Sequence, residues 1–194
     1  MTDIFQSSGD PGLSLPARPV MNDLVRSLVD DVTARQLGKL MADLFSSPPW
    51  NESWTEEAGQ NVILSMRDRG DSFFVIREEG ATHPIAVGIG RVVSTPRDEP
   101  DLLTFGVPSS TFHIHEVMVD KRFQGRGLAS SLMKALLAEA KRLDADFVSS
   151  RTRGDNPAML RVFRKFGFKC YGAEELEYAG VKHISCVLGF SENH

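Results

Sequence analysis

The chain has 194 residues, of which 41% are hydrophobic and 25% charged, a globular composition that excludes disordered, collagen-like and coiled-coil classes. Its net charge of −4 argues against general nucleic-acid binding, because such domains are usually basic. The apolar runs, such as 85–89, are far shorter than the roughly 20 residues that span a bilayer. Residues 1–19 lack the basic start and apolar core of a signal peptide, so we expect a soluble cytosolic protein without nucleic-acid or membrane partners.

Residues 1–20 are rich in Ser, Gly and Pro and are predicted to form a flexible tail, which leaves 21–194 as a single domain. Cys170 and Cys186 match no metal-ligand spacing. We interpret them as two buried thiols in a reducing compartment, not as a disulfide. No metal site is expected.

The first half of the chain predicts two helices followed by strands. A weak strand is predicted at 24–29 and an amphipathic helix at 33–45, where apolar residues recur at helical spacing. Thr55 can cap a second helix that ends by Gly70. The apolar pattern then predicts strands at 72–77, 84–94 and 112–119, with a Pro-rich loop at 96–110.

The second half contains the strongest helix, predicted over 127–143 from one continuous apolar stripe. A short strand at 146–150 and a second helix at 156–166 follow it. Two more strands are predicted at 168–171 and 182–190. This order is typical of a mixed α/β protein with a strand–helix–strand unit at its centre.

Residues 113–129 combine a strand, a glycine-containing loop and the start of the long helix. Gly125 and Gly127 permit unusual backbone angles, and the first helical turn leaves unpaired N–H groups. Three basic residues, Lys121, Arg122 and Arg126, lie in the same loop. The pattern therefore predicts a site for a phosphate-bearing ligand. A Walker loop is excluded because no lysine follows the glycines, and the dinucleotide fingerprint lacks its third glycine.

The residues Gln124-x-x-Gly127-x-Ala129 resemble the Gln/Arg-x-x-Gly-x-Gly/Ala motif of the GNAT acetyltransferase superfamily. About thirty residues later, Asn156 and the run 163–168 resemble the family's Asn…Tyr-x-Lys-x-Gly-Phe segment. The specific resemblance covers about residues 110–170. It implies an α/β (α+β) fold, with a mixed, mostly antiparallel twisted sheet of about six to seven strands and about four flanking helices.

The resemblance implies an N-acetyltransferase that moves an acetyl group from acetyl-CoA to a primary amine of a small molecule or peptide by direct attack, without a metal. The implied cofactor-binding residues are Val117, Met118 and Val119 through their backbone, the N–H groups of Gln124, Gly125, Arg126, Gly127, Leu128, Ala129 and Ser130, and Asn156 and Phe163 on the second segment. Asn156 is expected near the pantetheine arm.

The candidate catalytic bases are His115 and Glu116, which occupy the place where glucosamine-phosphate acetyltransferases carry an acidic pair. His113 lies two residues before His115, so the two share one face of a regular strand. Histidine titrates near neutral pH and suits proton removal. The sequence leaves the choice between His115 and Glu116 open, because geometry decides before pKa.

One residue departs from the family pattern. Phe163 stands where the family often has a tyrosine that can protonate the leaving thiolate, and phenylalanine donates no proton. Tyr171 and Cys170 are near in sequence, but no geometric reason selects them. An alternative function is therefore a catalytically weak coenzyme-A-binding sensor or interaction module on the same fold, and O-acetylation or a longer acyl donor is a third.

Charge is unevenly distributed. Residues 117–170 contain twelve basic and five acidic residues, a net charge of +7, which leaves −11 on the rest of the chain. A basic half suits a polyanion such as coenzyme A, and an acidic half suits a cationic acceptor. The cluster of Trp50, Glu52, Trp54, Glu56 and Glu57 could receive a cationic amine, or could equally be a capped helix whose Trp anchors the core. A homodimer is left open.

Overall fold

The computed structural model describes residues 24–48, 50–93, 110–178 and 181–190. The predicted tail at 1–20 and nearly all of the predicted loop at 96–110 lie outside these residues. The strands are β1 (Val25–Arg26), β2 (Ser72–Arg77), β3 (Pro84–Val93), β4 (Thr111–Val119), β5 (Phe147–Arg153), β6 (Lys169–Tyr178) and β7 (Val181–Gly189). The helices are α1 (Asp31–Phe45), α2 (Glu56–Asp68), α4 (Leu128–Arg142) and α5 (Pro157–Lys165), with a 3-10 turn η1 (Lys121–Phe123).

The seven strands form one sheet in the order β1-β2-β3-β4-β5-β7-β6. Five of the six neighbouring pairs are antiparallel, and β4 and β5 alone run parallel. The parallel pair follows from the crossover through α4, since parallel neighbours need a long connection. The sheet is therefore mixed and mostly antiparallel, as the family resemblance implied.

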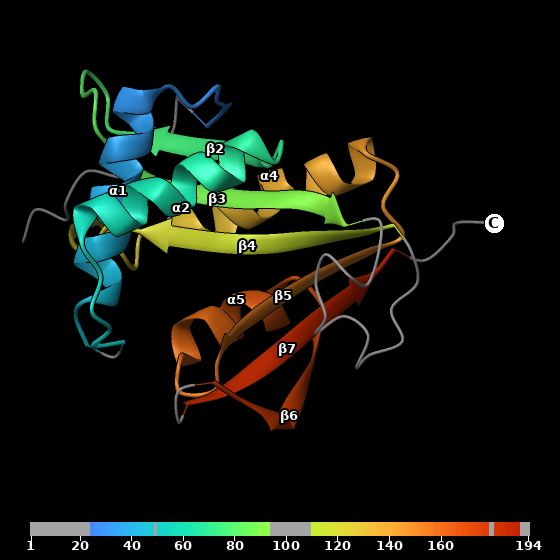
Figure 1. The fold of residues 1–194 in the computed structure, drawn as a ribbon. Coiled ribbons are helices and arrows are strands. Elements are labelled where there is room, and N and C mark those ends of the chain that lie inside the picture. Colours follow the sequence, from blue (N-terminus) through green and yellow to red (C-terminus); the bar gives the residue numbers. More distant parts are fainter. Residues whose placement is uncertain (1–23, 49, 94–109, 179–180, 191–194) are drawn as a thin grey trace, which may run out of the picture.

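The helices cover both faces of the sheet (Figure 1). On one face, α1 and α2 bury Leu37, Met41 and Ile63 against Val75 and Ile89. The apolar stripe of α4 packs on the other face with Phe112 and with Phe163 of α5. Two separate apolar clusters thus fix the sheet between two helical layers, and most of the folding free energy comes from their burial.

Local signals place the helix ends close to where the sequence predicts them. The side chain of Asp30 accepts a hydrogen bond from the Thr33 N–H, and that of Thr55 accepts one from the Ala58 N–H. Such caps satisfy N–H groups that the first turn leaves unpaired. In the sheet, β2 matches its predicted range, while β6 extends well beyond 168–171 because its pairing with β7 continues it to Tyr178.

The interpretation of the two cysteines was wrong. Cys170 and Cys186 lie directly opposite each other on β6 and β7 and form a disulfide. Opposite residues of an antiparallel pair have close Cβ atoms, so the pairing of these strands brings the sulfurs together. A spacing of 16 residues in the sequence carries no sign of this register.

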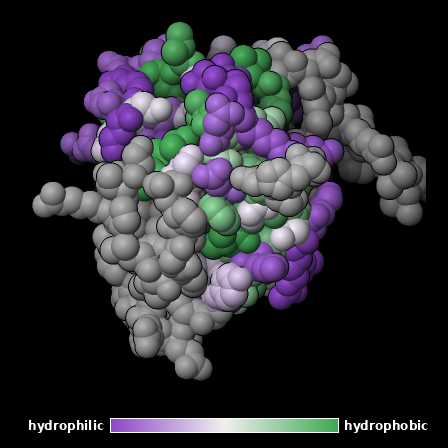
Figure 2. Space-filling view, turned by 90° about the vertical axis from the view of Figure 1, so that its right-hand side faces the viewer, coloured by the Kyte–Doolittle hydropathy of each residue, from purple (hydrophilic) through white to green (hydrophobic). Residues whose placement is uncertain are grey.

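The surface seen from the side where β4 and β5 begin mixes hydrophobic areas with hydrophilic ones (Figure 2). Within the described part of the chain, no helix is both long and apolar enough to cross a membrane.

Candidate functional site

The site lies where β4 and β5 separate. Their parallel pairing runs from Thr111 opposite Phe147 to Ile114 opposite Ser150 and ends there. The two strands then diverge, as Figure 1 shows. The backbone of Val117 and Met118 thus has β3 on one side but no β5 partner in the described register on the other. Such a strand edge can pair with an extended amide-bearing ligand.

The loop from β4 to α4 closes one end of this opening. Gly125 and Gly127 have φ values of +74° and +85°, and nothing lies within 4 Å of where their Cβ atoms would be. Gly127 caps α4 without any side-chain hydrogen bond, so the first N–H groups of the helix stay directed at the loop. This open cradle of N–H groups fits a diphosphate.

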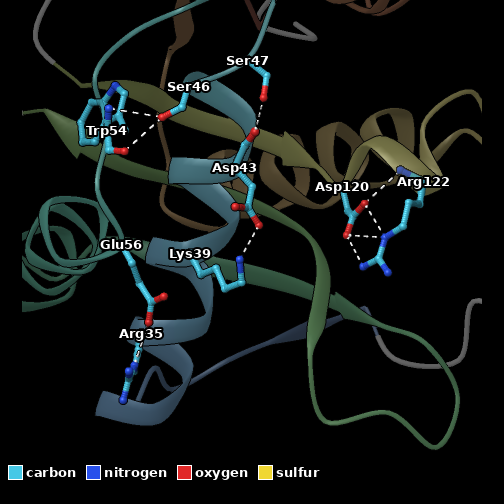
Figure 3. A network of polar contacts seen from close by, with 9 residues as sticks. All are labelled: Arg35, Lys39, Asp43, Ser46, Ser47, Trp54, Glu56, Asp120 and Arg122. Carbon is cyan, nitrogen blue, oxygen red and sulfur yellow. Dashed lines mark hydrogen bonds and ion pairs between the residues drawn. The ribbon is translucent and has the colours of Figure 1, made fainter.

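Basic residues surround the cradle. Arg122 is held by Asp120, with Nη2 2.7 Å from Oδ2, and this pair is drawn in Figure 3. Arg126 donates from Nη2 to the carbonyl of Arg122 at 3.2 Å. The ammonium of Lys165, which comes from α5, donates to Ser130 Oγ at 3.3 Å. Lys165 therefore lies at the start of α4, a position that its place in the sequence did not reveal.

Gln124 ties the loop to the strand. Its Nε2 donates to the carbonyl of Val119 at 3.0 Å, so the side chain of the motif's first residue fixes the turn that follows β4. This bond fixes the start of the loop that carries the N–H groups of Gln124 to Ser130.

A bulge in β4 sets the direction of the candidate bases. Glu116 pairs with Ile89, while Ile114 pairs with Gly90, so His115 is the extra residue of a bulge in β4. The bulge reverses the alternation of the strand. Val117 consequently contacts the cluster below α4, and Met118 is buried beneath α1 and α2.

Glu116 is partly buried beside the opening. Burial, together with the negative charge of Glu52, raises the pKa of its carboxyl from 4.5 to about 8. A carboxyl with this pKa is mostly neutral at pH 7, and its carboxylate is a stronger base than that of a solvated glutamate. Tuning of this kind is typical of catalytic acids and bases.

The two histidines have the opposite electrostatics. Burial lowers the pKa of His113 to about 4, and burial together with His113 lowers the pKa of His115 to about 2. Both imidazoles are therefore neutral across the physiological range. His113 Nδ1 lies 2.8 Å from Ser149 Oγ on β5, and the two rings meet edge to face at 4.8 Å.

The connection between α1 and α2, residues 46–55, lies beside Glu116 and β5. Trp50 packs edge to face on Phe45 at 5.2 Å, and Arg153 of β5 lies 5.1 Å above the Trp50 ring. Trp54 Nε1 donates to Glu52 Oε2 at 2.7 Å. The contacts of Ser46 with Trp54 fix the same segment to the end of α1 (Figure 3). The charge of Glu52 acts on both Glu116 and Arg153, so this segment reaches the separation of β4 and β5.

Two residues of the second motif have structural partners. Asn156 caps α5, accepting from the Met159 N–H at 3.1 Å and donating to Thr152 Oγ1 at 3.2 Å. Phe163 is fully buried against Phe168, with ring centroids 5.1 Å apart. Contact of either side chain with a cofactor stays a prediction. Cys170 cannot supply a proton to a thiolate while it is in the disulfide.

The comparisons with known proteins agree with this architecture. The model of the acetyltransferase (GNAT) family matches residues 37–168. The chain belongs to this family. The N-alpha-acetyltransferase RimI of Mycobacterium tuberculosis (strain ATCC 25618 / H37Rv) is 27% identical over 145 residues, covering 75% of this chain and 78% of RimI.

Solved structures show the same GNAT fold. The acetyltransferase yncA from Salmonella typhimurium, solved with its cofactor acetyl-CoA, has a TM-score of 0.67 at 15% identity and covers 89% of this chain and 97% of its own. The ribosomal-protein-alanine N-acetyltransferase from Brucella melitensis has a TM-score of 0.66 at 15% identity and covers 86% of this chain and 100% of its own.

The structure brings together most of the residues that the GNAT motifs predict, and it adds others. The predicted loop and the strand 117–119 follow each other at the end of β4, and Glu116 lies on the same strand, while the side chain of His115 is nearly buried and faces Asp71. Glu52 joins them from the first half of the chain, whereas Glu56 pairs with Arg35 on α1, away from the strand (Figure 3). Among the described residues, no group of three or more His, Cys, Asp and Glu could hold a metal ion.

Proposed function

We propose that the protein transfers an acetyl group from acetyl-CoA to a primary amine of a small molecule or peptide, with Glu116 as the general base. The observation that carries the proposal is the position of Glu116. Glu116 lies two residues after Ile114, the last residue of β4 that pairs with β5. Its carboxyl has a pKa raised to about 8 by burial and by the nearby charge of Glu52.

The residues that would hold acetyl-CoA fit its parts. The N–H groups of 124–130 suit the diphosphate, and Arg126 and Lys165 add positive charge beside it. The backbone of 117–119 suits the amide-bearing pantetheine arm. Bound there, acetyl-CoA supplies the thioester carbonyl that the amine attacks.

The protein's own contribution is to remove a proton and hold the amine. The ionised carboxylate of Glu116 takes a proton from the acceptor's ammonium group, which leaves a nucleophilic amine. A carbon–nitrogen bond then forms as the carbon–sulfur bond breaks, the sulfur leaves as a thiolate, and the nitrogen loses its second proton to that thiolate or to solvent. Because Phe163 has no proton to give, the thiolate departs without the help of a tyrosine at that position.

The acceptor side favours a cationic amine. Glu52 is exposed and accepts a hydrogen bond from Trp54 Nε1, so a carboxylate lies beside an aromatic ring on this segment. The likeness to RimI, whose name specifies an N-alpha-acetyltransferase, supports a peptide amino group as one acceptor class.

The second candidate, a coenzyme-A-binding sensor or interaction module, is favoured by Phe163. Both functions need the same loop, so binding of acetyl-CoA does not distinguish them. Transfer of the acetyl group to an amine does, because only the enzyme carries it out.

The test is release of coenzyme A thiol by the purified protein with a panel of polyamines, amino sugars and peptides with free N-termini, together with calorimetry of acetyl-CoA binding. We expect binding, thiol release that depends on one amine class, and an acetylated product by mass spectrometry. Absence of acetyl-CoA binding by the folded protein would overturn both candidates. Tight binding without turnover on the whole panel would leave the binding module as the function.

A further inference from the structure

A buried charge cluster lies at the start of β2, outside the groups that the proposed reaction uses. The side chain of Asp71 is fully buried. Arg69 Nη2 donates to Asp71 Oδ2 at 3.2 Å, and Arg91 Nε on β3 lies 3.5 Å from Asp71 Oδ1. Two guanidinium groups thus face one carboxylate beneath the layer formed by α1 and α2.

The cluster continues to the bulge of β4. His115, the extra residue of the bulge, is a neutral imidazole whose Nε2 lies 3.7 Å from Asp71 Oδ2, a close approach beyond hydrogen-bonding distance. The ring of His115 contacts that of His113, and His113 in turn contacts Ser149 on β5. A continuous polar row therefore joins β2, β3, β4 and β5 at the level where β4 and β5 separate.

The surroundings make this row unusual. Apolar side chains of the same face, among them Phe73, Ile89 and Met118, are buried beside it. Burying a carboxylate costs several kcal/mol, and apolar residues of similar volume often stabilise a fold as well or better. Stability alone thus does not account for the row. A role in placing Glu116, which directly follows His115, does account for it.

We propose that Asp71 is a positioning residue, which fixes the β4 bulge through His115 and thereby sets the direction of Glu116 toward the acceptor. The inference rests on the proposed function for its consequence in catalysis. Its structural part, that Asp71 holds the bulge, stands independently. A displacement of about 1 Å in a reacting group can cost up to about a hundredfold in rate.

The test compares Asp71→Asn, His115→Gln and the double variant. Glu139→Gln is the matched control, because Glu139 is also a buried acid that contacts two arginines, Arg142 and Arg26, but lies on α4 and accepts a hydrogen bond from Ser72 Oγ at the opposite face. Two readouts are used: hydrogen exchange of the peptide covering 112–119 without substrate, and kcat at saturating acetyl-CoA. Thermal unfolding checks that each variant is folded.

We expect Asp71→Asn and His115→Gln each to speed exchange at 112–119 and to lower kcat about tenfold, with the affinity for acetyl-CoA within twofold of wild type. The double variant should lose no more than either single variant, since both changes break the same contact. Glu139→Gln should lower stability without changing kcat.

Unchanged exchange at 112–119 in Asp71→Asn overturns the proposal, as do kcat losses that multiply in the double variant. Faster exchange in a protein whose wild type has no turnover would instead count against the proposed function alone. If Asp71→Asn does not fold, Arg91→Lys and His115→Gln provide the same comparison, and full activity with unchanged exchange in both overturns the proposal.

Discussion

At the scale of single residues, the surroundings of Glu116 give it a chemistry that a solvated glutamate lacks. Burial raises its pKa to about 8, and Glu52 adds to the rise. The base must be ionised to accept a proton, so the reactive fraction increases as the pH rises through about 8. The activity should therefore be favoured by mildly alkaline conditions.

Glu52→Gln tests the electrostatic part of this account. Removing the neighbouring negative charge lowers the pKa of Glu116, so the rising limb of kcat/KM should move to lower pH. The pH dependence of thiol release measures the shift. Glu57→Gln, an exposed acid on α2, should leave the limb in place. If the limb does not move in Glu52→Gln, the charge of Glu52 does not affect the pKa of Glu116.

The residue scale also shows what the sequence could not supply. The place of His115 and Glu116 on a strand makes both of them candidates, but their pKa values depend on burial and on groups far along the chain. Burial is the main cause of both shifts; Arg69 and Arg91 further depress the pKa of His115, whereas Glu52 adds to the rise at Glu116. Such pairings are set by strand register and loop position, which local patterns do not encode.

At the scale of elements, the junction of β4 and α4 was predictable because each of its parts has a local cause. The alternation of β4, the positive φ of Gly127 and the apolar stripe of α4 all follow from short sequence patterns. The bulge at His115 was not predicted. It arises from the pairing of β4 with β3, a contact between segments that are distant in sequence.

Gly127→Val should weaken acetyl-CoA binding at least tenfold, because a side chain would enter the open cradle of N–H groups. Gly80→Val is the matched control, since Gly80 has a similar φ of +75° and equally open space but lies in the turn before β3. Both variants should lose about 1–2 kcal/mol of stability from the strained backbone. Calorimetry should find normal binding in Gly80→Val. Equal weakening in both variants would argue against the cradle.

The crossing of α1 and α2 depends on two glycines. A Cβ at Gly38 would overlap the backbone N of Gln60, and one at Gly59 would overlap the carbonyl of Gly38. Gly38→Ala should therefore force the helices apart and lower the free energy of unfolding by about 1–3 kcal/mol, measured by denaturant unfolding. Ser65→Ala, on the exposed side of α2, should change it little. An unaltered midpoint in Gly38→Ala would mean that the helices do not approach this closely.

At the scale of the whole molecule, the fold class and the number of strands followed from the order of periodic segments together with the family resemblance. The contact between β6 and β7 that joins Cys170 to Cys186 did not, because antiparallel register depends on the turn and on packing against β5. The charge asymmetry of the sequence is reflected in the structure, where Arg126 and Lys165 lie at the cradle and Glu52 lies near Glu116.

The disulfide predicts a redox-dependent stability. Reduction should lower the melting temperature of the wild type, with a loss of about 3 kcal/mol for a closed loop of roughly 15 residues. A variant carrying Cys170→Ala and Cys186→Ala should melt at one temperature with or without reductant. Differential scanning calorimetry makes the comparison. A wild-type melting temperature that reductant leaves unchanged would contradict the cross-strand bond.

The central claim is that Glu116 removes the proton from an amine that is acetylated at the separation of β4 and β5. The pH dependence of acetyl transfer by the wild type and by Glu116→Gln tests it most directly. We predict that the wild-type kcat/KM rises with pH and levels off above about 8, and that Glu116→Gln loses at least about a hundredfold in kcat while binding acetyl-CoA within twofold of wild type. Wild-type turnover by Glu116→Gln, or a rate that does not vary between about pH 6 and pH 9, would contradict it.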